Sequence, residues 1–345
     1  MRSKVTIGLV LVLCVVIAIG VTNCFAGPKV YTLKYGYITP ELTPKDNNET
    51  AFAYAFKEYV EKNSNGQIKV HLYPGGQLGK FPEMIQGAMR GSVDIALVNA
   101  IPLNNFYPQS MIFGLPGVFV DKDECSAVLQ GPWGQKFNKG IEEKLGVKVL
   151  FHYSSGMRHF TNSKKMLRVP EDAKGLTIRV MESPVSIKMV EALGAKAVPI
   201  ASSEMYIAMQ NHVVDGQENP ISSIIQDLTY EVQNNIVLDG HFASSMMLLM
   251  NKKLYDGMPQ NLQKVIDTGV QKGWAEGKKV IDRQEIEGIE FLKSKGMQVY
   301  IPTKQELQRW HEVVGKPTQK YVRKQLGNKV VDDLLNAIKK YRNEQ

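Results

Sequence analysis

Cysteine and regularly spaced histidine are both scarce in this sequence. Of three cysteines in 345 residues, Cys14 and Cys24 lie in an N-terminal apolar segment, which leaves Cys125 alone. A lone thiol forms neither an internal disulfide nor a metal cluster. The six histidines stand singly, with no HExxH or HxxxH spacing, which argues against zinc. The sequence therefore predicts no metal and no cofactor.

The signatures of common enzymes are also missing. The sequence has no GxSxG elbow, no GxxxxGK[ST] loop and no strand-anchored GxGxxG. The serine pairs at 154–155 and 202–203 have no His or Asp partner at an informative spacing, and a serine nucleophile needs an adjacent base. We interpret these serines as loop and helix-capping residues.

The charge of the chain is mild and dispersed. Its 42 basic and 34 acidic residues give a net charge of +8, and no dense Lys/Arg block occurs. We therefore expect no nucleic-acid partner. Apolar residues make up 43% and charged residues 22%, which excludes a disordered chain and a polytopic membrane protein. The length predicts two domains.

Only one long hydrophobic run is present, and it lies at the N-terminus. Arg2 and Lys4 precede a nearly unbroken apolar run from Val5 to Val21, and Cys24-Phe25-Ala26 offers small residues at a cleavage site. This pattern predicts a secretory signal peptide over 1–26, cleaved near Ala26, and a periplasmic protein. The alternative is retention of this segment as a membrane anchor.

The rest of the chain alternates between strand and helix patterns. Strands at 30–38, 67–73 and 93–98 enclose helices at 49–63 and 81–90, a βαβαβ order that implies a parallel sheet. Further segments are expected as follows: a helix at 124–145, strands at 147–153 and 176–180, a helix at 184–193, a strand at 197–200, strand-like segments at 236–243 and 246–251, a long helix at 262–292, a strand at 298–301 and helix at 304–342. This predicts an α/β fold with ligands bound beyond the carboxyl ends of strands.

Two arginines and one asparagine stand out as candidate binding residues. Arg179 belongs to the apolar strand 176–180, and Arg158 follows the strand at 147–153. A buried arginine needs an anion, which is either an internal Asp or Glu or a ligand carboxylate held by the planar guanidinium. The string GQENP (216–220) is expected as a loop, in which Asn219 precedes Pro220 and is therefore biased toward an extended conformation that fixes the direction of its amide.

Several sequence strings resemble the substrate-binding proteins of TRAP transporters, the DctP-type family. They cover nearly the whole chain from about residue 31 to 335, in the family's order, and the most specific is VDGQENP (214–220). The others are YPGGQLG (73–79), FYP (106–108) with LP (115–116), GMRHFTN (156–162), GLTIRV (175–180) and SEMYIAMQ (203–210).

The resemblance implies a two-lobed fold like that of periplasmic binding proteins, with a cleft between the lobes and a long helix spanning both. Lobe I is expected over 27–153 plus about 243–284, and lobe II over 154–242 plus about 285–345. It also implies capture of a carboxylate-bearing organic acid, such as a dicarboxylate, keto acid or sugar acid. Delivery to a membrane permease follows, with no catalysis.

The family's site residues map onto seven positions of this sequence. The carboxylate-binding arginine falls on Arg179, with support from Arg158, and the ligand-facing asparagine falls on Asn219. The remaining implied contacts are Asn99, His241, Ile38 and Thr39. Sialic-acid binders carry a Glu at the position of Asn99 and an aromatic at that of Ser202, so the resemblance disfavours sialic acid.

Two other functions remain open from the sequence alone. A secreted α/β hydrolase or lyase that acts on an organic acid would need a nucleophile–base pair in the cleft. A ligand-sensing module of a membrane receptor would use the same cleft and differ only in its partner. The oligomeric state cannot be derived from the pattern, and a monomer is the simplest expectation.

Overall fold

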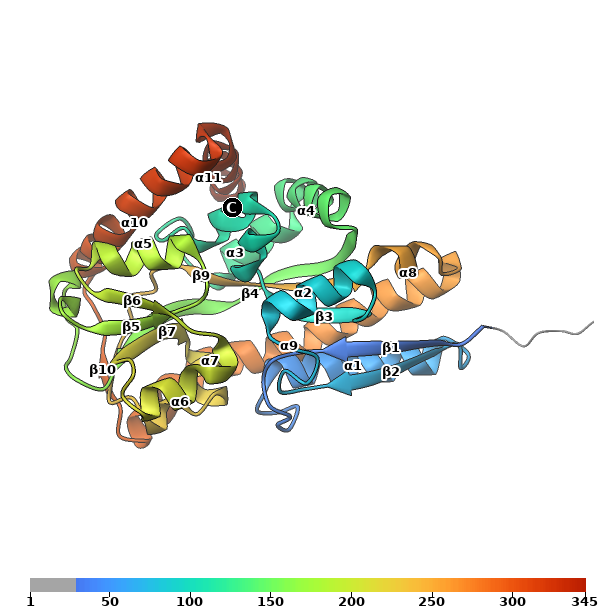
Figure 1. Ribbon diagram of the computed structural model, residues 1–345, viewed down its shortest axis with the longest axis horizontal. Coiled ribbons are helices and arrows are strands. Elements are labelled where there is room, and N and C mark those ends of the chain that lie inside the picture. The colour runs from blue at the N-terminus through green and yellow to red at the C-terminus, as the bar shows by residue number, and fades with distance from the viewer. Residues whose placement is uncertain (1–28) are drawn as a thin grey trace, which may run out of the picture.

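A computed structural model of the protein describes residues 29–345, and the expected signal peptide lies outside these residues. Ten strands form one continuous sheet with the order β2-β1-β3-β9-β4-β7-β5-β6, while β8 pairs with β4 and β10 (Figure 1). The strands are β1 (Tyr31–Gly36), β2 (Ile68–Tyr73), β3 (Ile95–Asn99), β4 (Val147–Asn162), β5 (Thr177–Val180), β6 (Lys196–Pro199), β7 (Gly216–Pro220), β8 (Asn235–Val237), β9 (Ala243–Asn251) and β10 (Gln298–Tyr300).

Helices cover both faces of this sheet (Figure 1). They are α1 (Asn48–Asn63), α2 (Phe81–Arg90), α3 (Lys122–Gln130), α4 (Pro132–Leu145), α5 (Pro184–Ala192), α6 (Met205–Gln210), α7 (Ile221–Gln226), α8 (Lys252–Asp256), α9 (Gln260–Ser294), α10 (Lys304–Leu326) and α11 (Asn328–Asn343). Within residues 29–345, none of them combines the length and the apolar character needed to span a bilayer.

The first lobe is built on β2, β1, β3, β9 and the first half of β4. β1 pairs in parallel with β2 and with β3, which confirms the expected βαβαβ unit. Leu33 and Tyr35 of β1 are fully buried because alternate residues of a strand point to the same face. They pack with Phe52 and Phe56 of α1 in one hydrophobic cluster. Because β1 and β3 run in parallel, their carboxyl ends lie at the same edge of the sheet.

β4 is the strand that joins the two lobes. Its first half pairs with β9 and its second half with β7 and β8, all antiparallel, and its register shifts between Ser154 and Met157. The expectation of a strand ending at Tyr153 and a loop at 154–156 was wrong, because Ser154 pairs with Ser245 and the strand continues to Asn162. Gly156 has a φ of 132°, a conformation that favours glycine within this irregularity.

The second lobe contains β7, β5, β6, β8, β10 and the second half of β4. Ile178 and Val180 of β5 are fully buried and pack with the helices on that side of the sheet. Residues 216–220 of the VDGQENP string form β7 rather than the expected loop, and all five residues of this strand are buried. β5 pairs with β7 in parallel, with Ile178 opposite Gly216, so residues 179 and 219 lie on neighbouring strands of one sheet.

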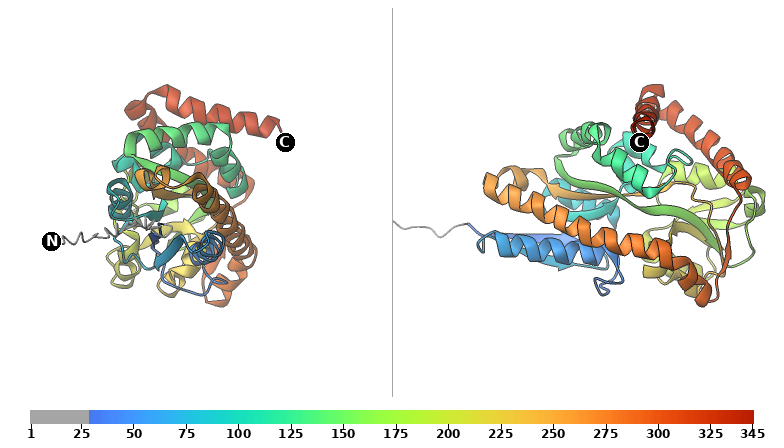
Figure 2. Two further views of the ribbon diagram at one scale, coloured as in Figure 1. Left: turned by 90° about the vertical axis from the view of Figure 1, so that its right-hand side faces the viewer. Right: turned by 180° about the vertical axis from the view of Figure 1, so that it is seen from behind.

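The 35-residue helix α9 runs along both lobes, as the right-hand view of Figure 2 shows. It packs closely on α1 of the first lobe, where a Cβ at Gly273 would lie 2.6 Å from the Phe52 ring. It also packs closely on α7 of the second lobe, where a Cβ at Gly288 would lie 2.4 Å from Ile221. A long helix spanning both lobes was expected, and the structure confirms it.

Two helical stretches are interrupted where the sequence pattern suggested continuity. The stretch 124–145 divides into α3 and α4 at Gly131-Pro132, since proline is favoured in the first turn of a new helix. The stretch 304–342 divides into α10 and α11 at Gly327, whose φ of 81° ends the first helix.

Candidate functional site

Arg179 lies in β5, is only 1% exposed and pairs with neutral groups among the residues that the structure describes. Its Nε donates a hydrogen bond to the carbonyl oxygen of Ile200 at 2.8 Å, and its Nη2 donates to Ser202 Oγ at 3.1 Å. Within residues 29–345, no carboxylate oxygen lies within 4.0 Å of the guanidinium. Burial lowers the pKa of Arg179 from 12.5 to about 10, although nearby Glu218 opposes this shift. The group stays cationic at neutral pH.

Arg158 lies in β4 and is also 1% exposed, but it has an internal acid. Its Nε and Nη2 both donate to the carboxylate of Glu218, with 3.0 Å from Nη2 to Oε1, and its Nη1 donates to Ser244 Oγ at 3.2 Å. Burial opposes ionisation of Glu218, but Arg158 and His241 outweigh it and lower the pKa of Glu218 to about 2. The sequence left open whether the anion of a buried arginine is an internal acid or a ligand carboxylate, and for Arg158 it is the internal acid Glu218.

His241 stands behind this ion pair and is fully buried. Its Nδ1 lies 2.7 Å from Asp239 Oδ2 and its Nε2 lies 3.3 Å from Glu218 Oε2. Burial disfavours the charged ring, but the two carboxylates outweigh it and raise the pKa of His241 from 6.5 to about 9. Both ring nitrogens therefore contact protein carboxylates, and the geometry gives His241 the role of orienting Glu218 and, through it, Arg158.

A cavity lies between the lobes at the ends of these strands. It brings together five of the seven expected residues: Ile38, Thr39, Asn99, Arg158 and Asn219. Arg179 lines an adjoining hollow. Four residues line both spaces: Ile38, Phe81, Met181 and Ser202. His241 lines neither space.

The expected polar residues of this cavity are held in place by short hydrogen bonds. Asn99 is 4% exposed, its Oδ1 accepts from the backbone N–H of Ile101 at 2.9 Å, and its Nδ2 faces Ser244 Oγ at 3.3 Å. Asn219 is 8% exposed and its Nδ2 donates to Gln217 Oε1 at 2.6 Å. Fixed side chains of this kind can present a defined pattern of donors and acceptors to a ligand.

Two acidic residues line the same cavity and were not singled out by the sequence analysis. Glu49 belongs to the first turn of α1, and Asp227 directly follows α7. Glu49 begins the helix expected at 49–63, and Asp227 lies outside the segments predicted from the sequence. The signal that identifies them is therefore spatial, because Glu49 from the first lobe and Asp227 from the second line one cavity.

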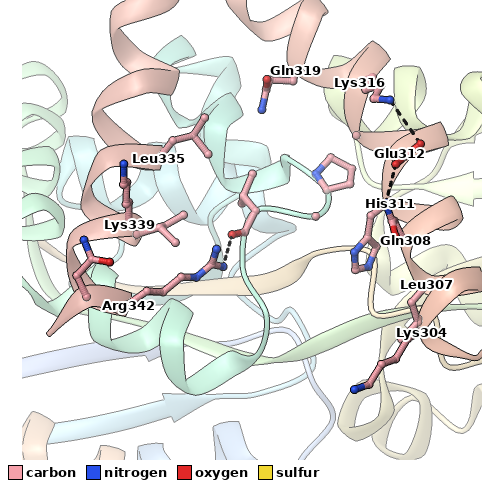
Figure 3. A pocket seen from close by; sticks show the side chains of 16 residues that line it. Lys304, Leu307, Gln308, His311, Glu312, Lys316, Gln319, Leu335, Lys339 and Arg342 are labelled. Carbon is pink, nitrogen blue, oxygen red and sulfur yellow. Dashed lines mark hydrogen bonds and ion pairs between the residues drawn. The ribbon is translucent and has the colours of Figure 1, made fainter. Parts of the chain in front are cut away.

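A second, wider hollow lies far from the strand ends, between α10, α11 and the turn at 116–118 (Figure 3). Its cationic groups differ from Arg179. Lys304, Lys316 and Lys339 are exposed, and Arg342 already holds Glu124 through two hydrogen bonds. The hollow has no buried charge without a partner, so the cavity at the strand ends is the better candidate for a ligand site.

Comparisons with known proteins place this chain in a family. Residues 38–325 match the family model described as "Bacterial extracellular solute-binding protein, family 7" (DctP). A "Solute-binding protein" of Verminephrobacter eiseniae is 34% identical, covering 74% of this chain and 76% of its own. The "C4-dicarboxylate-binding periplasmic protein DctP" of Rhodobacter capsulatus is 30% identical, covering 82% and 84%.

Solved structures agree with these relatives. The sugar acid binding protein DctPAm of Advenella mimigardefordensis, in complex with galactonate, has a TM-score of 0.85 at 29% identity and covers 91% of this chain and 99% of its own. A TRAP periplasmic solute binding protein of Polaromonas sp. JS666, bound to D-erythronate, has a TM-score of 0.82 at 31% identity, covering 88% and 98%.

The fold and the cavity define a two-lobed solute-binding protein. The chain belongs to the family of bacterial extracellular solute-binding proteins, family 7, the DctP-type receptors of TRAP transporters. It is therefore a transport receptor and not an enzyme, so the hydrolase or lyase alternative is set aside.

Proposed function

We propose that this protein captures a carboxylate-bearing organic acid in the periplasm and delivers it to a TRAP membrane permease. The observation that carries the proposal is Arg179, a 1% exposed guanidinium with hydrogen bonds only to neutral groups. A buried cation without an anion is costly, and a ligand carboxylate would supply the anion through two parallel hydrogen bonds.

The relatives support the chemical class of this ligand. D-Erythronate, galactonate and, in a structure from Shewanella oneidensis at 27% identity, succinate are the ligands of similar proteins. These molecules differ in length and in hydroxyl content, but each carries a carboxylate. The shared group is the one that Arg179 can bind, while Asn219, Asn99, Thr39 and Ile38 would contact the remainder of the ligand.

The proposed receptor acts as one chain, because both walls of the cavity come from the same polypeptide. We place the lobe boundaries at 153/154, near 242/243 and near 284/285, and a register shift in β4 between Ser154 and Met157 supports the first of them. Cleavage after Ala26 would release the mature protein with Gly27 at its N-terminus. Mass spectrometry of the periplasmic fraction checks this site, and a full-length membrane-bound product would contradict it.

A thermal-shift screen against organic acids tests the proposed function. A ligand present at 100 times its Kd raises the free energy of unfolding by about 2.7 kcal/mol, which is a clear rise in melting temperature. We expect at least one carboxylic acid to produce this rise and its matched alcohol or amide to produce none. A panel in which uncharged analogues stabilise the protein as well as the acids do would overturn the proposal.

A further inference from the structure

The cavity contains two carboxyl groups without a cationic partner. Glu49 is 7% exposed, and its Oε2 accepts hydrogen bonds from Thr39 Oγ1 at 2.9 Å and from the Thr39 backbone N–H at 3.4 Å. Asp227 lines the opposite wall. Among residues 29–345, no Lys, Arg or His nitrogen lies within 4.0 Å of either carboxyl group, in contrast to Glu218.

Apart from Arg158, the other polar groups of the cavity wall are neutral. They are hydroxyl and amide side chains that both donate and accept hydrogen bonds: Thr39, Asn48, Asn99, Ser155, Ser202, Asn219, Ser223 and Ser244. Among the described residues, Arg158 is the cation that lines this cavity, and Glu218 already neutralises it; the adjoining hollow adds Arg179 and the exposed Lys80, which is paired with Glu204. Within residues 29–345, the hollow therefore contributes one buried cation without a carboxylate partner, Arg179, and the cavity itself has two carboxyl groups without a cationic partner, Glu49 and Asp227.

We propose that this site selects a monocarboxylate that carries several hydroxyl groups, and that Glu49 and Asp227 accept hydrogen bonds from those hydroxyl groups and repel a second carboxylate. This inference rests on the proposed function, since it assumes that Arg179 binds the ligand's carboxylate. Glu49 comes from the first lobe and Asp227 from the second, so a hydroxylated ligand is held by both lobes.

The charge states of the two groups agree with this assignment. Burial raises the pKa of Glu49 from 4.5 to about 7, with hydrogen bonds from Thr39 opposing it and Asp227 adding to it. Burial also raises the pKa of Asp227 from 3.8 to about 6, against the attraction of Arg179 and Arg158. Each ionised group is thus already unfavourable in this cavity, and the second carboxylate of a dicarboxylate would add a further anion.

A ligand ammonium group would also be attracted to these carboxyl groups, but it fits the rest of the wall less well. An ammonium group only donates hydrogen bonds. The hydroxyl groups of Ser155 and Ser244, which line the same wall, can donate hydrogen bonds as well as accept them. A hydroxyl group supplies a donor to Glu49 and an acceptor to these residues.

Matched sugar acids test the proposal directly. Gluconate and glucarate, galactonate and galactarate, and erythronate and tartrate each form a pair of the same carbon number, in which one terminal CH₂OH is replaced by a carboxylate. Calorimetric titration at pH 8, where both acidic residues are ionised, should show at least tenfold tighter binding of the monocarboxylate in one pair or more. At pH 5.5 this ratio should fall, because Glu49 is then protonated.

Variants of the two acids identify the source of the selectivity. Glu49→Gln and Asp227→Asn should each reduce the ratio within the best pair at least fivefold. Glu58→Gln changes an exposed acid of the same helix α1 and should leave the ratio unchanged. Melting curves of all variants report whether each one folds.

Three results would overturn the inference. The first is that a dicarboxylate binds as tightly as its monocarboxylate partner and that Glu49→Gln does not change the ratio of the two affinities. The proposed function would then stand. The second is tighter binding of serine than of any hydroxy acid, which would assign the carboxyl groups to an ammonium group. The third is the absence of binding by any carboxylic acid, which would overturn the proposed function as well.

Discussion

Arg158 and Arg179 are equally buried, and β7 lies between their two strands, yet their surroundings differ completely. Arg158 belongs to a cluster in which Glu218, His241 and Asp239 contact one another in sequence. Arg179 contacts a carbonyl oxygen, a hydroxyl group and a sulfur atom. Burial alone therefore does not distinguish the two arginines, whereas the presence or absence of a protein carboxylate does.

The largest effect is expected when the paired arginine is removed. Arg158→Ala leaves Glu218 buried without its cation, and breaking a buried pair in this way typically costs ~3–5 kcal/mol. Denaturant unfolding should show a decrease of that order in the free energy of unfolding. The double variant Arg158→Met/Glu218→Leu removes both charges and should lose much less. An equal loss in the single and double variants would contradict the ion-pair interpretation.

The unpaired arginine should give the opposite pattern. Arg179→Ala should weaken binding of a carboxylate ligand about 30-fold to several thousand-fold, since truncating one partner of a desolvated charge pair typically costs ~2–5 kcal/mol. Arg179→Lys keeps the charge but loses the planar guanidinium that can form two parallel hydrogen bonds, so it should also bind the ligand poorly. Calorimetric titration measures both. The melting temperature of the ligand-free variant should not fall, and near-wild-type affinity in a destabilised variant would reverse the assignment.

Glu49 extends the comparison to acids, because its pKa is raised whereas that of Glu218 is lowered. Because the pKa of Glu49 in the folded protein is near 7, the folded protein binds this proton more tightly than the unfolded chain does. The contribution of this proton to the free energy of unfolding is therefore lost as pH rises from about 4.5 to 7. Ligand-free Glu49→Gln should therefore be more stable than wild type at pH 8, by on the order of 1–3 kcal/mol, and similar to it at pH 4.5. Denaturant unfolding at the two pH values measures this, and an equal difference at both would contradict it.

The smallest effect is expected at an exposed ion pair. Lys80 of the first lobe, which lines the same hollow as Arg179, forms a salt bridge with Glu204 of the second lobe, and both side chains are substantially exposed. Exposed pairs contribute little because water and salt screen them. Lys80→Ala should leave the melting temperature of the ligand-free protein unchanged within error, and a large decrease would mean that exposure does not govern these charge effects.

The sequence predicted the elements of the fold well, because hydrophobic periodicity reports on local structure. It missed the continuation of β4 beyond Tyr153 because Ser154, Ser155 and Gly156 have the composition of a loop. Only pairing with β9 and β7, which is not local, makes them a strand. The same reason explains why VDGQENP was expected as a loop and forms β7.

The candidate site was less accessible to sequence reasoning. Arg179 and Arg158 both stood out, but their difference depends on Glu218, which is brought to Arg158 by the pairing of β4 with β7. Glu49 and Asp227 could not be identified at all, because they are 178 positions apart in the sequence and meet only when the lobes come together. The seven expected binding residues themselves stay a prediction until a ligand is tested.

The glycines of α9 have a mechanical consequence. α9 packs closely on α1 as far as Gly277 and on α7 at Gly288, so it is held at two places along its length. Any rotation of one lobe against the other must therefore deform the helix between these two glycines. Lys122 of α3 contacts Asp282 and Glu285 within this stretch, at 2.9 Å and 3.2 Å. A movement of the lobes that opened or closed the cavity would therefore change the curvature of α9 beside these ion pairs.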